Sequence, residues 1–275
     1  MEVNRLMQQV TGQVVQNRDL GHGLWHLIVE APEIAAAARP GQFAMLRVGP
    51  RLEPLLRRPI SFYRIVKYNG WVEFIYKLVG KGTEILTGKV PGDSIDLVGP
   101  LGQGWTLLPE TKRIGVLGRG IGIAPQISLA EAARKRGIEV HAFFSAREPE
   151  LIVGLELLEE LGCKMYLHSD RGAYSGKVQV VTEYLEELLA REKLDQLYTC
   201  GSRRLGRFLL DCWLERGIKG QISLEERMAC GLGACVGCVT EIVTDQATGK
   251  REYQRVCKEG PVFWVEEVGM LYDYC

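Results

Sequence analysis

Four cysteines near the C-terminal end constrain this chain more than any other feature. Three of them share one short stretch, Cys230-x4-Cys235-x2-Cys238, and Cys257 follows further along. This spacing matches the plant-type pattern of thiolates that hold a [2Fe–2S] cluster. The three glycines between the first three cysteines let the loop fold tightly, because glycine accepts backbone angles closed to other residues. The spacing therefore predicts an iron–sulfur cluster with these four cysteines as its ligands.

Two other uses of cysteine compete with this interpretation. A structural zinc site also takes four cysteines, usually as two C-x2-C pairs, whereas this chain has one such pair. Under that alternative the protein would be a zinc-stabilised binding module without enzymatic activity. Disulfides are disfavoured because the chain opens Met1-Glu2-Val3-Asn4-Arg5, without the apolar core of a signal peptide. Eight cysteines without such a segment favour the cytoplasm and redox or metal chemistry.

Composition excludes several classes of function. The chain has 275 residues, of which 46% are hydrophobic and 25% charged, as in ordinary soluble globular proteins. Lys+Arg and Asp+Glu are both 34, and no basic stripe suggests a nucleic-acid partner. No apolar run approaches the ~20 residues of a membrane span. The length allows two domains and a small third one.

The first part of the chain, residues 1–107, predicts an antiparallel β-barrel. Its segments are short, β-branched and aromatic, and the Asn69-Gly70 pair is a strong hairpin signal. With no long helix between them, we expect six strands that close into a barrel. The expected strands are Val10–Asn17, Leu24–Glu30, Gln42–Val48, Pro59–Val66, Trp71–Leu78 and Ser94–Val98.

The pattern changes near residue 108, where short apolar strands begin to alternate with helical segments. This alternation predicts a parallel sheet covered by helices over residues 108–220. We expect strands at Arg113–Gly118, Glu139–Ser145, Cys163–His168 and Leu194–Cys200, and helices at Ala124–Arg136, Glu150–Leu161, Val178–Arg191 and Leu205–Arg216. A further strand, Gln221–Glu225, leads into residues 221–275, which are too few to fold well without the cluster as their core.

A glycine-rich turn joins the first strand and helix of this second part. Gly118, Gly120 and Gly122 stand where a doubly wound sheet binds nucleotides, because glycines allow close approach and a helix N-terminus favours a pyrophosphate. The spacing G-x-G-x-G differs from the G-x-G-x-x-G fingerprint, so a tight turn without a ligand remains an alternative. Arg147 and Glu148 follow the second strand, which leaves both NADP and NAD open.

Three other motifs carry chemistry. Arg57-Arg58-Pro59-Ile60-Ser61 combines an arginine fork, a fixed proline and a hydroxyl, which suits a phosphate. Gly80-Lys81-Gly82-Thr83 is not a P-loop, since Gly82 follows the lysine and Ile75 stands where the first glycine belongs. Cys200-Gly201 ends the last core strand, where ligands of such sheets bind, although an inert buried cysteine is equally compatible.

The order of these motifs resembles the ferredoxin–NADP reductase superfamily over nearly the whole chain. Within it, the stretches Leu224–Cys235 and Val256–Phe263 resemble the electron-transfer subunits of class 1B dihydroorotate dehydrogenases, which serve pyrimidine biosynthesis. The resemblance implies an FAD-binding barrel, an NAD-binding α/β domain and a [2Fe–2S] domain. It also implies a cytoplasmic oxidoreductase that works with an FMN-containing catalytic subunit, as a heterotetramer of two plus two.

Site residues follow from matching motifs. The resemblance implies that Arg58, Pro59, Ile60, Ser61, Ile75, Tyr76, Lys77, Gly82 and Thr83 bind FAD. Gly118, Gly120, Gly122 and Gly201 would bind NAD, and Cys200 would lie at the nicotinamide as the catalytic residue. Cys230, Cys235, Cys238 and Cys257 would ligate the cluster.

The chain departs from the family pattern at the predicted nucleotide site. Arg119 stands where the family usually has glycine, and Ser202-Arg203-Arg204 follows Cys200-Gly201 where a small residue or proline is common. These departures suggest an alternative: a sister NAD(P)H reductase that serves another partner, such as a ferredoxin or sulfide oxidoreductase. The gap between Cys238 and Cys257 is long for the family and predicts an inserted hairpin around Thr248-Gly249.

Overall fold

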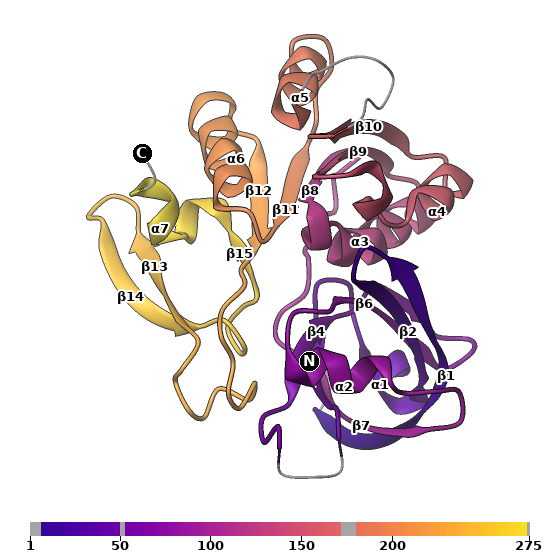
Figure 1. Cartoon of the computed structure of the whole chain (residues 1–275). Helices are drawn as coiled ribbons and strands as arrows, with labels where there is room; N and C mark the ends of the chain where they lie inside the picture. Colours follow the sequence, from indigo (N-terminus) through magenta and orange to yellow (C-terminus); the bar gives the residue numbers. More distant parts are fainter. Residues whose placement is uncertain (1–6, 50–52, 172–179, 274–275) are drawn as a thin grey trace.

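A computed structural model describes residues 7–49, 53–171 and 180–273. The chain forms an antiparallel sheet, then a parallel sheet flanked by helices, then a two-stranded hairpin (Figure 1). In Figure 1 the antiparallel sheet lies below the parallel sheet, and the hairpin β13–β14 lies to one side. No helix among the described residues is long and apolar enough to span a membrane.

The first sheet has seven antiparallel strands in the order β4-β3-β7-β1-β2-β6-β5. Alternate side chains such as Leu27, Leu46 and Phe74 are fully buried on its inner face, as expected for strands with one face on a core. The strands are β1 (Gln8–Gly21), β2 (Leu24–Glu30), β3 (Phe43–Arg47), β4 (Arg58–Ser61), β5 (Arg64–Val66), β6 (Trp71–Lys77) and β7 (Ser94–Leu101). Two short helices, α1 (Pro32–Ala37) and α2 (Lys81–Thr87), accompany them.

The predicted closed barrel of six strands is wrong. Residues 59–66 do not form one strand but divide into β4 and β5, which are the two ends of the sheet and do not pair within the described part of the chain. The reason lies at the break between them. The Phe62 N–H donates to Gln42 O on the β3 side (3.1 Å), whereas the Tyr63 N–H donates to Glu73 O on β6 (2.8 Å). The chain therefore crosses the gap between the two edges and leaves it open.

The second sheet has the order β10-β9-β8-β11-β12-β15, and its first five strands are parallel. This confirms the predicted parallel sheet. The elements are β8 (Arg113–Arg119), α3 (Ala124–Lys135), β9 (Glu139–Ala146), α4 (Leu155–Glu160), β10 (Lys164–Ser169), α5 (Val181–Leu189), β11 (Gln196–Cys200), α6 (Arg203–Arg216) and β12 (Lys219–Ser223). The edge strand β15 (Val262–Trp264) comes from beyond the cysteine loop and pairs antiparallel with β12.

Two predicted helices differ from the structure. The segment 150–161 is not one helix, because Gly154 adopts a left-handed conformation (φ +82°) that separates the short 3₁₀ turn η2 (Pro149–Leu151) from α4. The helix predicted over 178–191 appears as α5, and residues 178 and 179 lie outside the described residues. The helix α2 was not predicted.

The last part of the chain adds the hairpin of β13 (Val239–Asp245) and β14 (Lys250–Arg255), then η3 (Val265–Glu267) and α7 (Gly269–Tyr272). The hairpin turns at the predicted place, around Thr248-Gly249. One hydrophobic core connects all three parts, since it contains Met45, Leu117 and Cys238 together. The boundaries at 107 and 220 remain predictions, and Cys275 lies outside the described residues.

Candidate functional site

A cavity of about 400 Å³ opens between the gap in the first sheet, the glycine-rich turn and the segment that leads into the cysteine loop. Its walls therefore come from all three parts of the chain. Most of the residues expected at the flavin lie on it, together with the cysteine expected at the nicotinamide. These are Arg58, Pro59, Ile60, Ser61, Ile75, Tyr76, Lys77, Thr83 and Cys200.

The open sheet explains why these residues meet. Arg58–Ser61 is the whole of strand β4 and Ile75–Lys77 ends strand β6, so the two sets stand on opposite sides of the gap. Tyr76 is held by a hydrogen bond from its hydroxyl to Asn17 Oδ1 (3.1 Å), and burial raises the pKa of this phenol. A closed barrel would have paired the edges and filled this space with side chains.

Gly82 lies in the first turn of α2, against the Arg58 side chain. A Cβ added at Gly82 would lie 2.2 Å from Arg58 Nε, so only glycine leaves the guanidinium in place. Thr83 caps this turn: its hydroxyl accepts from the Val79 N–H (3.0 Å). Arg57 points elsewhere, because its guanidinium forms a bidentate pair with Asp96 (2.9 and 2.7 Å). Arg58 is thus the arginine available to an anionic group in the cavity.

Cys200, which is 3% exposed, lines the cavity from the end of β11. Burial, with a contribution from the Glu225 carboxylate, raises the pKa of its thiol to about 12, so the thiol remains protonated at neutral pH. Gly122 brings the glycine-rich turn against this strand, since a Cβ there would lie 2.5 Å from Cys200 O. Gly201 follows with φ +72° and lines a small adjoining pocket of about 50 Å³.

Glu225 is a site residue that the sequence interpretation missed. It lines both the main cavity and the small pocket beside Gly201, and its carboxylate forms neither a hydrogen bond nor an ion pair with the described residues. The carboxyl opens onto the cavity, yet the surrounding protein removes enough water to raise its pKa. A signal existed, because Glu225 follows β12 at the carboxyl end of a parallel strand, where ligands of such sheets bind.

The glycine-rich turn leaves β8 through a 3₁₀ turn, η1 (Gly120–Ile123), that leads into α3. Gly118 packs on Ile123, and Gly120 (φ +56°) has open space where a side chain would be. The Arg119 guanidinium donates to Asp170 Oδ2 at 2.6 Å and holds the pKa of that carboxyl below its usual range. Both side chains are about half exposed at the carboxyl edge of the sheet.

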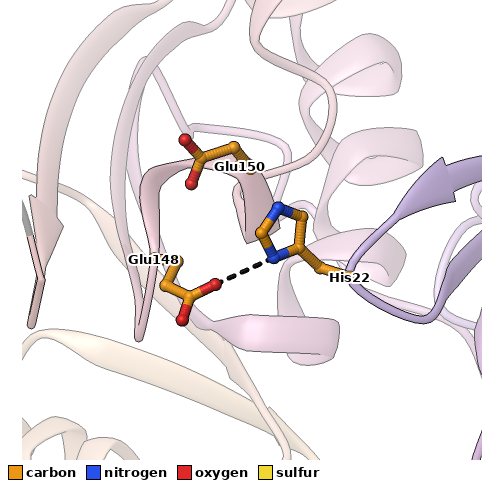
Figure 2. A group of neighbouring side chains, drawn as sticks. All are labelled: His22, Glu148 and Glu150. Atoms are coloured by element: carbon orange, nitrogen blue, oxygen red, sulfur yellow. Dashed lines mark ion pairs between the residues drawn. The ribbon is translucent and has the colours of Figure 1, made fainter.

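Glu148 follows β9 at the same edge and is held from two directions. Its Oε2 lies 2.8 Å from His22 Nδ1, on the turn between β1 and β2, and its Oε1 accepts from Arg171 at 3.2 Å. Figure 2 shows the His22 ring beside Glu148, with Glu150 near its other side. These contacts tie the first sheet to the second at the edge where a dinucleotide ribose would bind.

Three of the four predicted cluster ligands lie on the loop before β13, and the fourth, Cys257, lies in the turn that follows β14. Cys238 and Cys257 are each 2% exposed, while Cys235 is exposed. Backbone N–H groups point at the sulfurs: Leu232 and Cys235 donate to Cys230 Sγ (3.3 and 3.4 Å), and Gly233 donates to Cys257 Sγ (3.1 Å). Such donors stabilise thiolates and tune the potential of an iron–sulfur cluster.

The thiols associate as two pairs. Burial would raise the pKa of Cys230, but the N–H groups of Cys235 and Leu232 and the neighbouring Cys235 side chain lower it to about 6. Burial, with the neighbouring Cys238 thiol, raises the pKa of Cys257 to about 12. Hydrogen bonds join the same residues, because the Cys235 N–H donates to Cys230 Sγ and the Cys257 N–H donates to Cys238 Sγ, each at 3.4 Å. A two-iron cluster takes two thiolates on each iron, so this arrangement fits it.

A single tetrahedral zinc site fits less well. Its sulfurs lie ~2.3 Å from the metal and so about 3.8 Å from one another. Among the described residues, two groups of three or more His, Cys, Asp or Glu side chains have ligand atoms that all lie within 4.8 Å of one another, and neither group contains a cysteine.

Comparisons with known proteins identify the family of the region that contains these cysteines. Residues 225–269 match the family described as the iron-sulfur cluster binding domain of dihydroorotate dehydrogenase B. The chain is 34% identical to the "Dihydroorotate dehydrogenase B (NAD(+)), electron transfer subunit" of Desulforamulus reducens, over 87% of this chain and 90% of that protein. The protein of the same name from Geobacillus thermodenitrificans is 35% identical over 93% of this chain and 96% of its own length.

The chain belongs to the family of dihydroorotate dehydrogenase B electron transfer subunits. Solved structures extend the likeness to the fold. An NADH-dependent reduced ferredoxin-NADP oxidoreductase superposes with a TM-score of 0.80 at 25% identity, covering 95% of this chain and 91% of that one. A ferredoxin NADP+ reductase from Neisseria gonorrhoeae with bound FAD and NADP superposes with a TM-score of 0.63 at 20% identity, covering 76% of this chain and 92% of its own. The fold is thus that of ferredoxin–NADP reductases with an added iron–sulfur region.

Proposed function

We propose that this chain is the FAD- and [2Fe–2S]-containing oxidoreductase subunit that carries electrons from a dihydroorotate-oxidising partner to NAD+. One observation carries the proposal: the flavin-type cavity and the paired cysteines are built around one continuous core. Phe43 lines the cavity and belongs to the same hydrophobic cluster as Cys238 and Cys257. Met228 lines the cavity two residues before the first cluster cysteine.

The donor set of the cavity fits FAD. Arg58 and Ser61 would hold phosphate and ring polar groups, and Gly82 with Thr83 would face the pyrophosphate. The apolar and polar walls around the ring and ribityl chain would be formed by Ile75–Lys77, Pro59 and Ile60. When bound, FAD collects single electrons and passes them on as a hydride, which matches a one-electron cluster to a two-electron nicotinamide.

The chain's own residues position the reactants and exclude water. Cys200 and Gly201 would lie against the nicotinamide, and the neutral thiol presents an uncharged, compact surface there. Glu225 would lie beside the ring, because it follows the adjacent parallel strand β12 at the same edge of the sheet. Gly118, Gly120 and Gly122 would let the NAD pyrophosphate approach the backbone, as in other doubly wound sheets. The hydride step requires no general base from the protein.

The partner would be an FMN-containing catalytic subunit, in a heterotetramer of two plus two. A charge-balanced chain such as this one recognises partners through shape and apolar contacts. The exposed apolar side chains Leu232, Val236 and Val239 on and beside the cysteine loop supply such a surface. The four cluster thiolates must stay reduced to bind iron, so we place the chain in a reducing compartment such as the cytoplasm.

Reconstitution tests this function. The purified chain is mixed anaerobically with an FMN-containing dihydroorotate dehydrogenase subunit from the same host, and NADH formation from dihydroorotate and NAD+ is followed at 340 nm. We expect turnover only when both subunits are present. A complex that forms but never produces NADH, although each subunit contains its cofactors, would contradict the proposal.

A second candidate function rests on the structural similarity to the ferredoxin-NADP oxidoreductase. Under this alternative the same relay would serve a larger iron–sulfur flavoprotein. Affinity purification of the chain from its host separates the two. An FMN-containing barrel enzyme in the eluate supports the first function, and a larger iron–sulfur flavoprotein supports the second.

Glu225 provides a prediction about pH. Its folded-state pKa is raised by burial, so its contribution to stability is fully present below the unfolded pKa near 4.5 and is lost as the pH rises through the folded value. Glu225→Gln should therefore gain thermal stability relative to the parent as the pH rises from 4 toward 7. Melting temperatures of both proteins across this range test it. A constant difference would show that the carboxyl titrates as an ordinary surface acid.

Arg119 provides a second prediction. Removing its guanidinium leaves the Asp170 carboxylate with only a longer described ion pair, to His168 at 3.8 Å, at the edge where the nucleotide pyrophosphate would bind. Arg119→Ala should weaken NADH binding severalfold, and Arg119→Ala/Asp170→Asn should restore most of it because the negative charge of Asp170 is gone. Fluorescence titration with NADH measures both. If the double variant binds no better than the single one, the pair has no electrostatic role at this site.

A further inference from the structure

Strand β3 presents its side chains alternately to two different cores. Ala44 and Leu46 are fully buried in the core of the first sheet. Phe43 (2% exposed) and Met45 (0%) point to the opposite face, into the core that contains the cluster cysteines Cys238 and Cys257. Successive side chains of a strand point to opposite faces, so residues 43 and 45 face one core and residues 44 and 46 face the other.

Met45 contacts the cysteine loop directly. Gly231, the residue after the ligand Cys230, has φ +70°, and a Cβ added to it would lie 2.6 Å from Cγ and 2.7 Å from Sδ of Met45. The absence of a side chain at Gly231 therefore lets the thioether pack against the loop backbone. Methionine suits such a contact because its side chain is unbranched and polarisable.

Phe43, on the same face of β3, contacts the flavin cavity in the way that Met45 contacts the cysteine loop. Its side chain lines the space assigned to the flavin, and the same strand pairs with β4, placing Phe43 opposite Ser61 and Met45 opposite Pro59. Two neighbouring side chains on one face of one strand thus contact the flavin cavity and the cluster loop. Strand β3 is rigid here, since it is paired on both sides, with β4 and with β7.

We propose that Phe43 and Met45 are positioning residues that fix the separation between the cluster and the flavin. The inference rests on the proposed function and adds to it the residues that set the efficiency of electron transfer. Because protein interiors are close-packed, the Met45 side chain that fills the space between β3 and the cysteine loop keeps the cluster at one distance from the flavin cavity. Its removal would let the loop move or leave a void between strand β3 and the cysteine loop.

The test uses the full chain loaded with FAD and cluster. The rate of electron transfer from the reduced cluster to the flavin is measured after rapid photoreduction, together with the EPR spectrum of the reduced cluster and both midpoint potentials. Met45→Ala should slow the transfer by about tenfold, because small displacements between reacting groups have large effects on rate. Met45→Leu, which conserves volume, should restore it.

Leu46→Ala is the matched control. Leu46 is as buried as Met45 and neighbours it on β3, but it points into the other core. We expect this variant to lose thermal stability to a similar extent and to keep the parental transfer rate. Gly231→Ala approaches the same contact from the loop and should also slow the transfer, so the test remains available if Met45→Ala folds poorly.

The outcomes distinguish failure of the positioning role from failure of the proposed function. Parental transfer in Met45→Ala or in Gly231→Ala, with potentials unchanged, would overturn the positioning role, as would an equal slowing by Leu46→Ala. A parent protein that contains no iron or no flavin would instead refute the proposed function. Slowed transfer with unchanged potentials in Met45→Ala, beside a normal Leu46→Ala, would establish the role.

Discussion

Replacing Cys257 by serine is expected to abolish the visible absorption of the cluster and to lower iron content to background. Cys257 is 2% exposed, accepts the Gly233 N–H and lies in the core shared by all three parts of the chain. A metal centre contributes its binding free energy to folding, so its loss should also destabilise the C-terminal region by several kcal/mol. Iron analysis, visible spectroscopy and thermal unfolding measure the three effects.

Cys212→Ser is the control for this experiment. Cys212 is also buried, at 5% exposure, and belongs to the same hydrophobic core, but it lies on α6 and is not one of the paired thiols. The Cys212→Ser substitution should lower the free energy of unfolding slightly and leave the iron content unchanged. Equal loss of iron in both variants would mean that the cluster responds to general packing and that Cys257 is not a ligand.

Replacing Arg58 by alanine is expected to weaken FAD binding roughly thirtyfold. A hydrogen bond between a charged donor and a phosphate contributes about 2 kcal/mol, and 1.4 kcal/mol corresponds to a factor of ten. The variant should therefore lose flavin during gel filtration while keeping its iron. Gly82→Ala should act in the same direction, because the added Cβ would displace the Arg58 guanidinium.

Arg57 supplies the matched control on the neighbouring residue. Its guanidinium is bound to Asp96 and turned away from the cavity, so Arg57→Ala should retain FAD and lose only a modest amount of stability. The flavin content of the two variants, measured from the 450 nm absorption after purification, decides between them. Equal retention of FAD by Arg58→Ala and Arg57→Ala would remove Arg58 from the flavin site.

The cysteine spacing predicted the cluster from local sequence alone, because its ligands lie mostly on one loop. The glycine turn and the parallel sheet were also predictable, since strand and helix periods are local properties. The flavin residues were inferred from resemblance, because no local pattern brings Arg58 and Tyr76 to one cavity. Their meeting depends on the open gap between β4 and β5, which the chain creates at Phe62 and Tyr63.

The remaining features depend on contacts between distant segments. Glu225 acquires its raised pKa from the protein around it, and no feature of the residue itself predicts that environment. Met45 looks like an ordinary core residue of a strand. Only the fold places it against Gly231, which lies far along the chain in the cysteine loop. The short helix α2 was missed because its glycine and threonine favour turns over helices.

The central claim is that one chain holds an iron–sulfur cluster and a flavin around a shared core. Purification under anaerobic conditions, followed by quantification of iron, acid-labile sulfide, zinc and FAD, tests it most directly. We predict about two irons, two sulfides and one FAD per chain, with negligible zinc. A colourless protein, or one that contains zinc in place of iron and retains no flavin, would contradict it.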